Sequence, residues 1–558
     1  MRHHCPARNL GMVAVALGLF LSPSLGWAQT DTVTAPTPSM QIRLRSLTEL
    51  LNKAEYVANL FDQGETIRGI KALLFLSRLQ GKGVEGIHPD RPLGAYAFFK
   101  PDVIDSSVVL LIPIANQEAF LKLLKERLNL KVDKEKEQMY KLAVPEDLPL
   151  PAIGIDHLYV RLEQDYAYVA RYETDLDPKR LIPAKTFFGG DDKATISVAL
   201  RLDHLSNDLK KFVLGEFEMN IEEGMRNDPP QDEVGKLLAP WFKNQLMNAL
   251  QVSVLDASEL RLQLDIDEKK GELIGELSVT PVADSLLAQN LRTFAKRQSL
   301  PAGIVQIATP SAVSAGIHWG LTPLARREFA QVAEQIAAEV VKKAAPEERD
   351  LVEGLFKAIL PTLQAGEGDL MAALLPADRQ GRHKLLAAAT VQQGPAIEKY
   401  FKSIAPILST VELADFSFDR EIINGFRIHK VVINGLPERA EQVFGTSTLW
   451  LAVTERCVVV SIEENGELLR TALKQGRPVS VPLLGLHASA AELLPVLAPH
   501  LRPDEIKALQ KEAFGDNPPP RRDQLSLQVT AGEKLTIRIQ AHGPAIRLLW
   551  VADVFRPN

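Results

Sequence analysis

A unit of two strands followed by a helix recurs four times along the chain, and this recurrence limits the possible folds more than any other feature. In the first copy, Gly94–Phe99 and Ser107–Ile114 alternate apolar and polar residues, and Asn116–Leu128 then repeats apolar residues at a helical period. The other copies begin near Leu260, Asp369 and Gln524. A fixed order of elements repeated in one chain indicates a fold assembled from similar parts.

The residue before each of these helices is suited to starting a helix. An Asn or Asp side chain can accept a hydrogen bond from the first turn, and Pro at the first helical position has no N–H to leave unpaired. In the last two copies, "QQGPAIEKYF" and "AHGPAIRLLW", Pro395 and Pro544 are expected at that first position. The predicted caps are Asn116, Asp284, Gly394 and Gly543.

These hairpins predict an α+β fold. Strands that return on themselves pair antiparallel, and a helix after each hairpin covers one face of the sheet. A further strand pair, Tyr159–Ala170, resembles Trp450–Ser461, and the parts follow one another in the same order twice. We therefore expect two pseudo-repeated halves, residues 43–300 and 301–558, each an antiparallel sheet with helices packed on one face.

Alternation within "LRLQLDID" predicts which side chains point into the protein. Leu260, Leu262, Leu264 and Ile266 share one face of the strand and are expected inside. Arg261, Gln263 and Asp265 share the other face, which is either solvated or lines a groove.

The N-terminus is typical of a cleaved secretory signal. Arg2 and Arg8 precede the apolar run Leu10–Leu21, and a small-residue site follows at Gly26-Trp27-Ala28. A membrane anchor needs about 20 apolar residues, more than this run supplies before Ser22 and Pro23. We predict a signal peptide at residues 1–28 with cleavage after Ala28, then a flexible Thr/Pro-rich leader at 29–42. The mature protein is expected to be secreted or periplasmic, with no transmembrane span.

Charge and cysteine content exclude several classes of protein. Residues 1–28 carry two Arg and no acidic residue, so their removal changes the formal charge from -6 to -6 - 2 = -8. An acidic chain with scattered basic residues is a poor partner for nucleic acid. Cys457 is the one cysteine left after cleavage, and its β-type surroundings predict a buried hydrophobic residue.

The common catalytic and metal motifs are absent. The sequence has no His-Glu-x-x-His, no Gly-x-Ser-x-Gly, no phosphate-binding Gly-x-x-x-x-Gly-Lys-Ser/Thr and no Cys-x-x-Cys. Three histidines near strand ends, His204, His318 and His487, are weak candidates for metal ligands or acid/base groups. Their equivalent places in repeated units favour a structural role, and Asp203 is not expected to orient His204. We predict no catalytic residue, no cofactor and no cofactor-binding residue.

The strand-Pro-x-Ala-Asn/Asp-helix units, "LLIPIANQEAFLKLL" and "LSVTPVADSLLAQNL", resemble large secreted bacterial proteins of unknown function built from repeated strand-strand-helix modules. This resemblance implies an envelope or extracytoplasmic protein and no particular activity.

Three functional hypotheses follow. The first is a non-catalytic binding or scaffold protein that holds a protein, a peptide or an apolar ligand. The second is a secreted or periplasmic enzyme, hydrolase-like, with dispersed residues in a cleft between the halves. The third is a carrier of an apolar ligand, which predicts a continuous apolar tunnel along a sheet.

Overall fold

The structure is a computed structural model that describes residues 37–69, 71, 86–100, 105–127, 129–145, 155–190, 193–497, 501–515 and 523–552. The predicted signal peptide, residues 1–28, and the start of the predicted leader lie outside these residues. Strand β1 begins at Met40, so the last three residues of the predicted leader belong to a strand and not to a flexible segment.

The chain divides into two compact units. Unit 1 comprises Met1–Gly215, Ala257–Glu268 and Gly275–Thr280, and unit 2 comprises Glu216–Asp256, Lys269–Ile274 and Pro281–Asn558. The units therefore interleave between residues 216 and 281, and the linear halves 43–300 and 301–558 remain a prediction.

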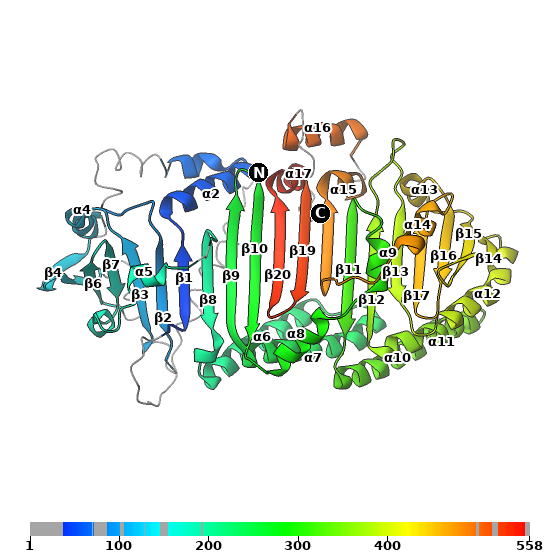
Figure 1. The fold of residues 1–558 in the computed structure, drawn as a ribbon, viewed down its shortest axis with the longest axis horizontal. Coiled ribbons are helices and arrows are strands. Elements are labelled where there is room, and N and C mark those ends of the chain that lie inside the picture. Colours follow the sequence, from blue (N-terminus) through cyan, green and yellow to red (C-terminus); the bar gives the residue numbers. More distant parts are fainter. Residues whose placement is uncertain are drawn as a thin grey trace. The chain divides into compact units, whose positions relative to one another are not determined.

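Unit 1 is built on an antiparallel sheet whose strands follow the order β4-β5-β6-β7-β3-β2-β1-β8-β9-β10 (Figure 1). β1 lies between β2 and β8, so the first strand of the described chain is interior to the sheet. The strands are β1 Met40–Leu44, β2 Leu93–Phe98, β3 Ser107–Pro113, β4 Lys131–Lys136, β5 Met139–Ala143, β6 His157–Glu163, β7 Tyr166–Ala170, β8 Ile196–Arg201, β9 Ala257–Asp267 and β10 Glu272–Pro281.

The helices of unit 1 cover parts of both sheet faces. α5 places Phe187 against Tyr96 and Tyr168 on one face, and α4 with η2 places Phe120 and Leu124 against β5 to β7 on the other. The elements are α2 Leu47–Leu60, α4 Gln117–Lys122, the π-helix η2 Leu123–Arg127, the 3-10 helices η4 Glu173–Leu176 and η5 Leu202–His204, and α5 Ala184–Phe187. α6 (Asn207–Asn227) runs from unit 1 into unit 2.

Unit 2 is built on a second antiparallel ladder, in the order β14-β15-β16-β17-β13-β12-β11-β18-β19-β20 (Figure 1). The strands are β11 Val313–Gly320, β12 Glu367–Leu374, β13 Leu385–Thr390, β14 Ala414–Ile423, β15 Phe426–Ile433, β16 Thr448–Val453, β17 Cys457–Ile462, β18 Leu484–Ser489, β19 Gln524–Ala531 and β20 Leu535–His542. The predicted α+β class with antiparallel sheet is confirmed.

The main core of unit 2 lies between its sheet and two helices. Ile304 of α9 and Leu469 and Leu473 of α14 pack on Leu386, Ala388 and Val459. The helices are α7 Glu233–Leu255, α8 Leu286–Ala295, α9 Leu300–Val305, α10 Pro323–Lys343, α11 Arg349–Ala365, α12 Gly394–Thr410, α13 Glu438–Phe444, α14 Glu467–Gln475, α15 Ala490–Leu497, α16 Pro503–Phe514 and α17 Gly543–Val551. Across the described residues, no helix combines the length and apolar character needed to cross a bilayer.

The four predicted helix starts differ in detail. Asn116 caps α4 as expected, because its side chain accepts a hydrogen bond of 2.8 Å from the Ala119 N–H. The prediction for Asp284 is wrong: Ser285 caps α8, and Asp284 adopts a positive φ of 60° in the preceding turn. Gly394 and Gly543 are also not the caps but the first helical residues, so α12 and α17 begin one residue earlier than predicted.

Gly394 is required by a close contact with the backbone. A side chain at this position would overlap the carbonyl oxygen of Thr454, in the turn between β16 and β17. We expect Gly394→Ala to lower the free energy of unfolding by about 1–3 kcal/mol, since backbone atoms must move to make room. Urea unfolding followed by circular dichroism measures this loss.

Gly215→Ala in α6 is the matched control. Nothing lies within 4 Å of the added methyl group, and alanine favours a helix over glycine by about 1 kcal/mol. Equal stability changes in the two variants would contradict the assigned role of Gly394.

Candidate functional site

On one face of the unit 1 sheet, the side chains that lie opposite one another on neighbouring central strands are all aliphatic. The register between β9, β8, β1, β2 and β3 aligns three such rows: Leu264-Ile196-Leu44-Leu93, Leu262-Val198-Ile42-Ala95-Leu110 and Leu260-Leu200-Met40-Ala97-Val108. Large side chains in these rows are exposed, for example Val108 (45%) and Leu264 (41%). Large contiguous apolar areas are common at interaction sites, so this face is the candidate site of unit 1.

This arrangement corrects the prediction that Leu260, Leu262, Leu264 and Ile266 point into the protein. Leu262 and Leu264 are exposed, and Leu260 and Ile266 are partly buried. Alternation identifies which residues share a face, but it does not show which face another layer covers.

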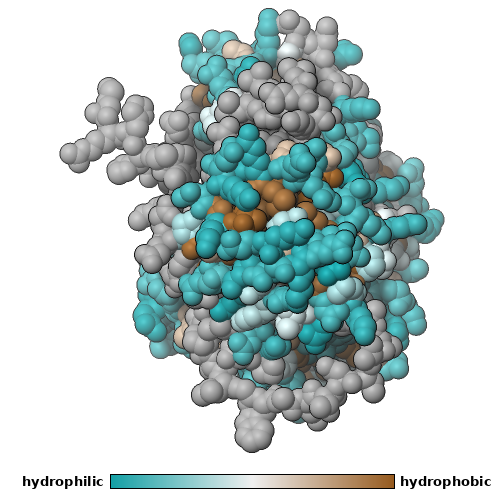
Figure 2. All heavy atoms as spheres, turned by 90° about the vertical axis from the view of Figure 1, so that its left-hand side faces the viewer, coloured by the Kyte–Doolittle hydropathy of each residue, from teal (hydrophilic) through white to brown (hydrophobic). Residues whose placement is uncertain are grey.

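Unit 2 exposes an aliphatic face of the same kind. Ile317 on β11 lies opposite Leu370 on β12 and Leu484 on β18, and all three are exposed. The next row, Ile539-Leu527-Leu486-Ala315-Ala372-Ala387, is also entirely aliphatic. We call these two surfaces the aliphatic faces of unit 1 and unit 2. Figure 2 looks at the left-hand side of Figure 1, where β4 and α4 of unit 1 lie, and shows an apolar patch bordered by hydrophilic side chains.

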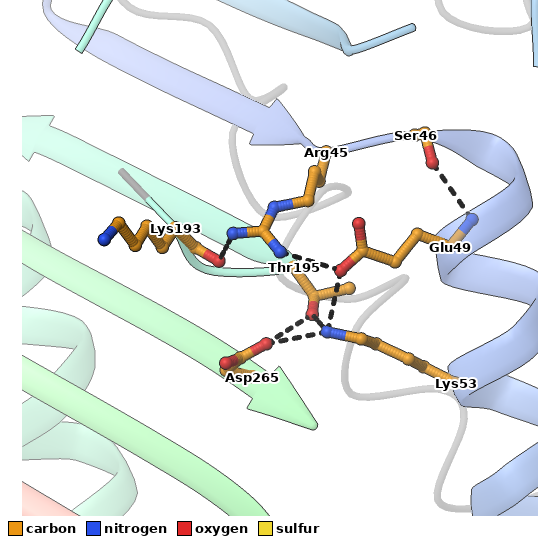
Figure 3. Close-up of polar contacts among 7 residues, drawn as sticks. All are labelled: Arg45, Ser46, Glu49, Lys53, Lys193, Thr195 and Asp265. Atoms are coloured by element: carbon orange, nitrogen blue, oxygen red, sulfur yellow. Dashed lines mark hydrogen bonds and ion pairs between the residues drawn. The ribbon is translucent and has the colours of Figure 1, made fainter. Parts of the chain in front are cut away.

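The opposite face of the unit 1 sheet is polar and holds helix α2 in place. Lys53 of α2 is almost fully buried, and its ammonium donates to Asp265 on β9 at 2.8 Å and lies 2.8 Å from Glu49 (Figure 3). It also donates to Thr195, whose hydroxyl donates to Asp265 at 2.8 Å. Burial opposes the charged form of Lys53, but Asp265 and Glu49 outweigh it and raise the pKa of the amine. The contacts join three segments into a structural anchor.

The three histidines singled out from the sequence do not form one site. His204 lies in unit 1 and contacts the carbonyl of Thr37 at 3.1 Å. His318 and His487 lie in unit 2 on adjacent strands, but His487 pairs with Ser314, four residues before His318. Four residues of strand span about 13 Å. His318 and His487 therefore cannot bind one metal ion together.

The segment around His204 also differs from the expected strand. Leu202–His204 forms a 3-10 helix, so the alternation by which neighbouring strand residues point to opposite faces does not apply to Asp203 and His204. The two side chains approach to 4.0 Å, while Asp203 accepts hydrogen bonds from Arg201 at 3.0 and 3.2 Å. Burial opposes ionisation of Asp203, but Arg201 outweighs it and lowers the pKa of the carboxyl. Asp203 is therefore held mainly by Arg201.

His318 has a carboxylate partner that sequence reasoning missed. Its Nδ1 hydrogen-bonds Asp369 on β12, and the other Asp369 oxygen accepts from Thr390 at 3.0 Å. Ser299, at the start of α9, hydrogen-bonds the same carboxylate. Burial opposes ionisation of Asp369, but His318 and the hydroxyl donors outweigh it and lower the pKa. No local pattern indicates this cluster, because its members come from four separate segments.

A second acidic cluster, Glu398, Asp419 and His429, has the residue types of a metal site. Its candidate ligand atoms lie within 4.8 Å of one another. However, Nδ1 of His429 accepts a hydrogen bond from the Asp419 N–H at 3.0 Å, so the proton of the neutral ring lies on Nε2. Nε2 is the atom 3.7 Å from Glu398 that would have to bind the ion.

The carboxylates of this cluster are also paired with cations. Lys402 lies 2.8 Å from Glu398 and 2.7 Å from Asp419, and Arg427 donates to Glu398 at 2.6 Å. Burial opposes ionisation of Glu398, but these cations outweigh it and lower its pKa. The cluster is better described as an ion-pair network than as a metal centre.

The buried ring of His429 predicts a specific pH dependence. Burial lowers its pKa below the ordinary value of 6.5, so protonation favours the unfolded chain and stability falls as the pH drops below that value. We expect His429→Asn to be less stable at pH 7.5 but to lose less stability than the wild type between pH 7 and pH 5. Urea unfolding across this range measures the two slopes. Parallel curves would show that His429 does not cause the acid sensitivity.

The other residues discussed from the sequence are structural. Burial raises the pKa of the Cys457 thiol to about 12, which leaves it protonated and unreactive at neutral pH. Tyr166, Tyr168 and Trp450 are buried in the cores of their units.

The described chain is thus an α+β protein with an exposed aliphatic face on the sheet of each unit. The chain matches no known family model, no curated protein and no solved structure.

Proposed function

We propose that this is a non-catalytic binding protein of the periplasm or cell exterior whose aliphatic faces bind an apolar ligand. The supporting observation is the uninterrupted register of aliphatic side chains across neighbouring strands, with Leu486 and Ile539 about half exposed. Burying such area contributes roughly 25 cal/mol per Å². The faces offer no polar side chain in these rows, so they suit a hydrocarbon chain better than a polar polymer.

The carrier hypothesis is retained in an altered form. It predicted a continuous apolar tunnel, whereas the aliphatic rows lie on exposed sheet faces. Phe242 of α7 and Leu324 of α10, both in unit 2, are also exposed and add apolar area on helices. An open face binds ligands of varied length, because it imposes no end wall.

The proposal includes a tandem duplication. The ten described strands of unit 1 and the ten described strands of unit 2 follow the same order, with the first strand between the second and the eighth. Two related units account for two aliphatic faces in one chain. The predicted signal peptide supports an extracytoplasmic location.

The test is to purify the mature protein from its own envelope without detergent and to analyse an organic extract by mass spectrometry. We expect a lipid to co-purify with the protein. After the lipid is removed, the protein should bind dansylundecanoate with a rise in the fluorescence of the probe. A chain that carries no lipid and binds no probe would overturn the proposal. A dimer that masks the faces would give that result, and light scattering would identify it.

A further inference from the structure

A pocket on the polar face of the unit 1 sheet contains two arginines. Arg43 and Arg45 alternate along β1 and therefore point to the same side, away from the aliphatic face. The pocket has a volume of about 320 Å³, which is within the range of small-molecule sites. It is lined by Arg43, Leu44, Arg45, Asp90, Pro92, Phe188, Ala194 and Ser197.

The guanidinium of Arg43 is held in position. It donates to the side-chain oxygen of Gln41 at 2.8 Å, and it lies 5.1 Å from the centre of the Phe187 ring. On either side in the sheet are Gly94 of β2 and Ser197 of β8. A side chain at Gly94 would come within 2.8 Å of Phe187 and 3.2 Å of Phe188, so this glycine allows both rings to approach the sheet.

Arg45 forms part of the pocket wall and supplies a second positive charge. It donates to Glu49 at 3.1 Å and to the carbonyl of Lys193, which fixes the side chain at the edge of the pocket (Figure 3). Among the described lining residues the acidic one is Asp90, which accepts a hydrogen bond of 2.7 Å from Thr48. Glu49 offsets the charge of Arg45, so the guanidinium of Arg43 is the group assigned to ligand binding.

We propose that this pocket binds a small organic carboxylate through Arg43. A planar guanidinium matches the two oxygens of a carboxylate, and because Glu49 already pairs with Arg45 the pocket suits a monoanion better than a phosphate dianion. Phe188 and Pro92 provide an apolar wall for the rest of the ligand. The pocket lies on the opposite side of the sheet from the aliphatic face, so the inference does not depend on the proposed function.

Isothermal titration with benzoate and its neutral isostere benzamide tests the inference. We expect benzoate to bind at least about tenfold more tightly than benzamide and than inorganic phosphate, since hydrogen bonds to a charged group are worth about 1.5–3 kcal/mol. Arg43→Gln should weaken benzoate binding by about tenfold or more. Arg201→Gln, which removes a guanidinium elsewhere in unit 1, should leave it unchanged.

Arg45→Gln is a second pocket variant in case Arg43→Gln does not fold. Arg45 is partly exposed at the pocket edge, and its loss should weaken benzoate binding without affecting benzamide. Equal affinity for benzoate and benzamide, or unaltered benzoate affinity in a folded Arg43→Gln or Arg45→Gln variant, would overturn the inference. So would the absence of benzoate binding at millimolar concentrations. If benzoate and benzamide instead bind to the aliphatic face, neither arginine variant will change their affinities.

Discussion

Asp369→Ala is expected to lower the free energy of unfolding by about 3–5 kcal/mol, because it leaves several buried donors without an acceptor, at about 1–3 kcal/mol each. The substitution leaves the His318 Nδ1–H and the hydroxyls of Thr390 and Ser299 without their shared acceptor. Both His318 and Asp369 are buried, so water cannot easily replace the carboxylate. Because Ser299 begins α9, the loss should also loosen this helix from the sheet.

Urea unfolding at pH 7.5 measures the effect, with Thr390→Val as the control. The control removes one donor but keeps the carboxylate and the remaining donors, so a loss of only about 1 kcal/mol is expected. If Asp369→Ala and Thr390→Val are equally stable, the cluster does not anchor α9 in the way described.

The double substitution Leu486→Glu with Ile539→Glu is expected to reduce dansylundecanoate binding by at least about tenfold. Each carboxylate would have to be desolvated beneath the ligand, which costs more than the 1.4 kcal/mol that a tenfold change requires. Leu486 is 43% and Ile539 56% exposed, so both new side chains can reach water in the free protein. The folded state should therefore be largely retained.

The matched control is Gln528→Glu with Thr530→Glu. These exposed residues alternate on β19 with Leu527 and Val529, which places them on the opposite face. The control adds the same charge at the same sheet but should leave probe binding unchanged. Comparable losses in both double variants would point to net charge, and not to the aliphatic face, as the cause.

Local patterns in the sequence predicted the hairpins and the cap at Asn116. Both depend on short-range physics: a period of two favours a half-buried strand, and an Asn side chain can reach the third residue after it. The same reasoning misplaced two starts by one residue: α12 already begins at Gly394, and Ser285 rather than Asp284 caps α8.

The sites were less predictable from the sequence. Leu262 and Leu264 were correctly assigned to one face, but the exposure of that face depends on where helices pack. Asp369 joins His318, and Lys53 joins Asp265, across 51 and 212 residues of sequence. Arg43 and Arg45 drew no attention as isolated residues, since the pocket exists only once Phe188 and Ser197 lie beside them.

The sequence by itself therefore determined the class of elements, their antiparallel pairing and the sets of residues that share a strand face. These properties follow from backbone periodicity and from interactions between residues close along the chain. The tertiary structure alone decided which sheet faces remain exposed, which buried charges are paired and where two arginines meet an aromatic wall. Each of those depends on contacts between distant segments, whose free energy no local pattern encodes.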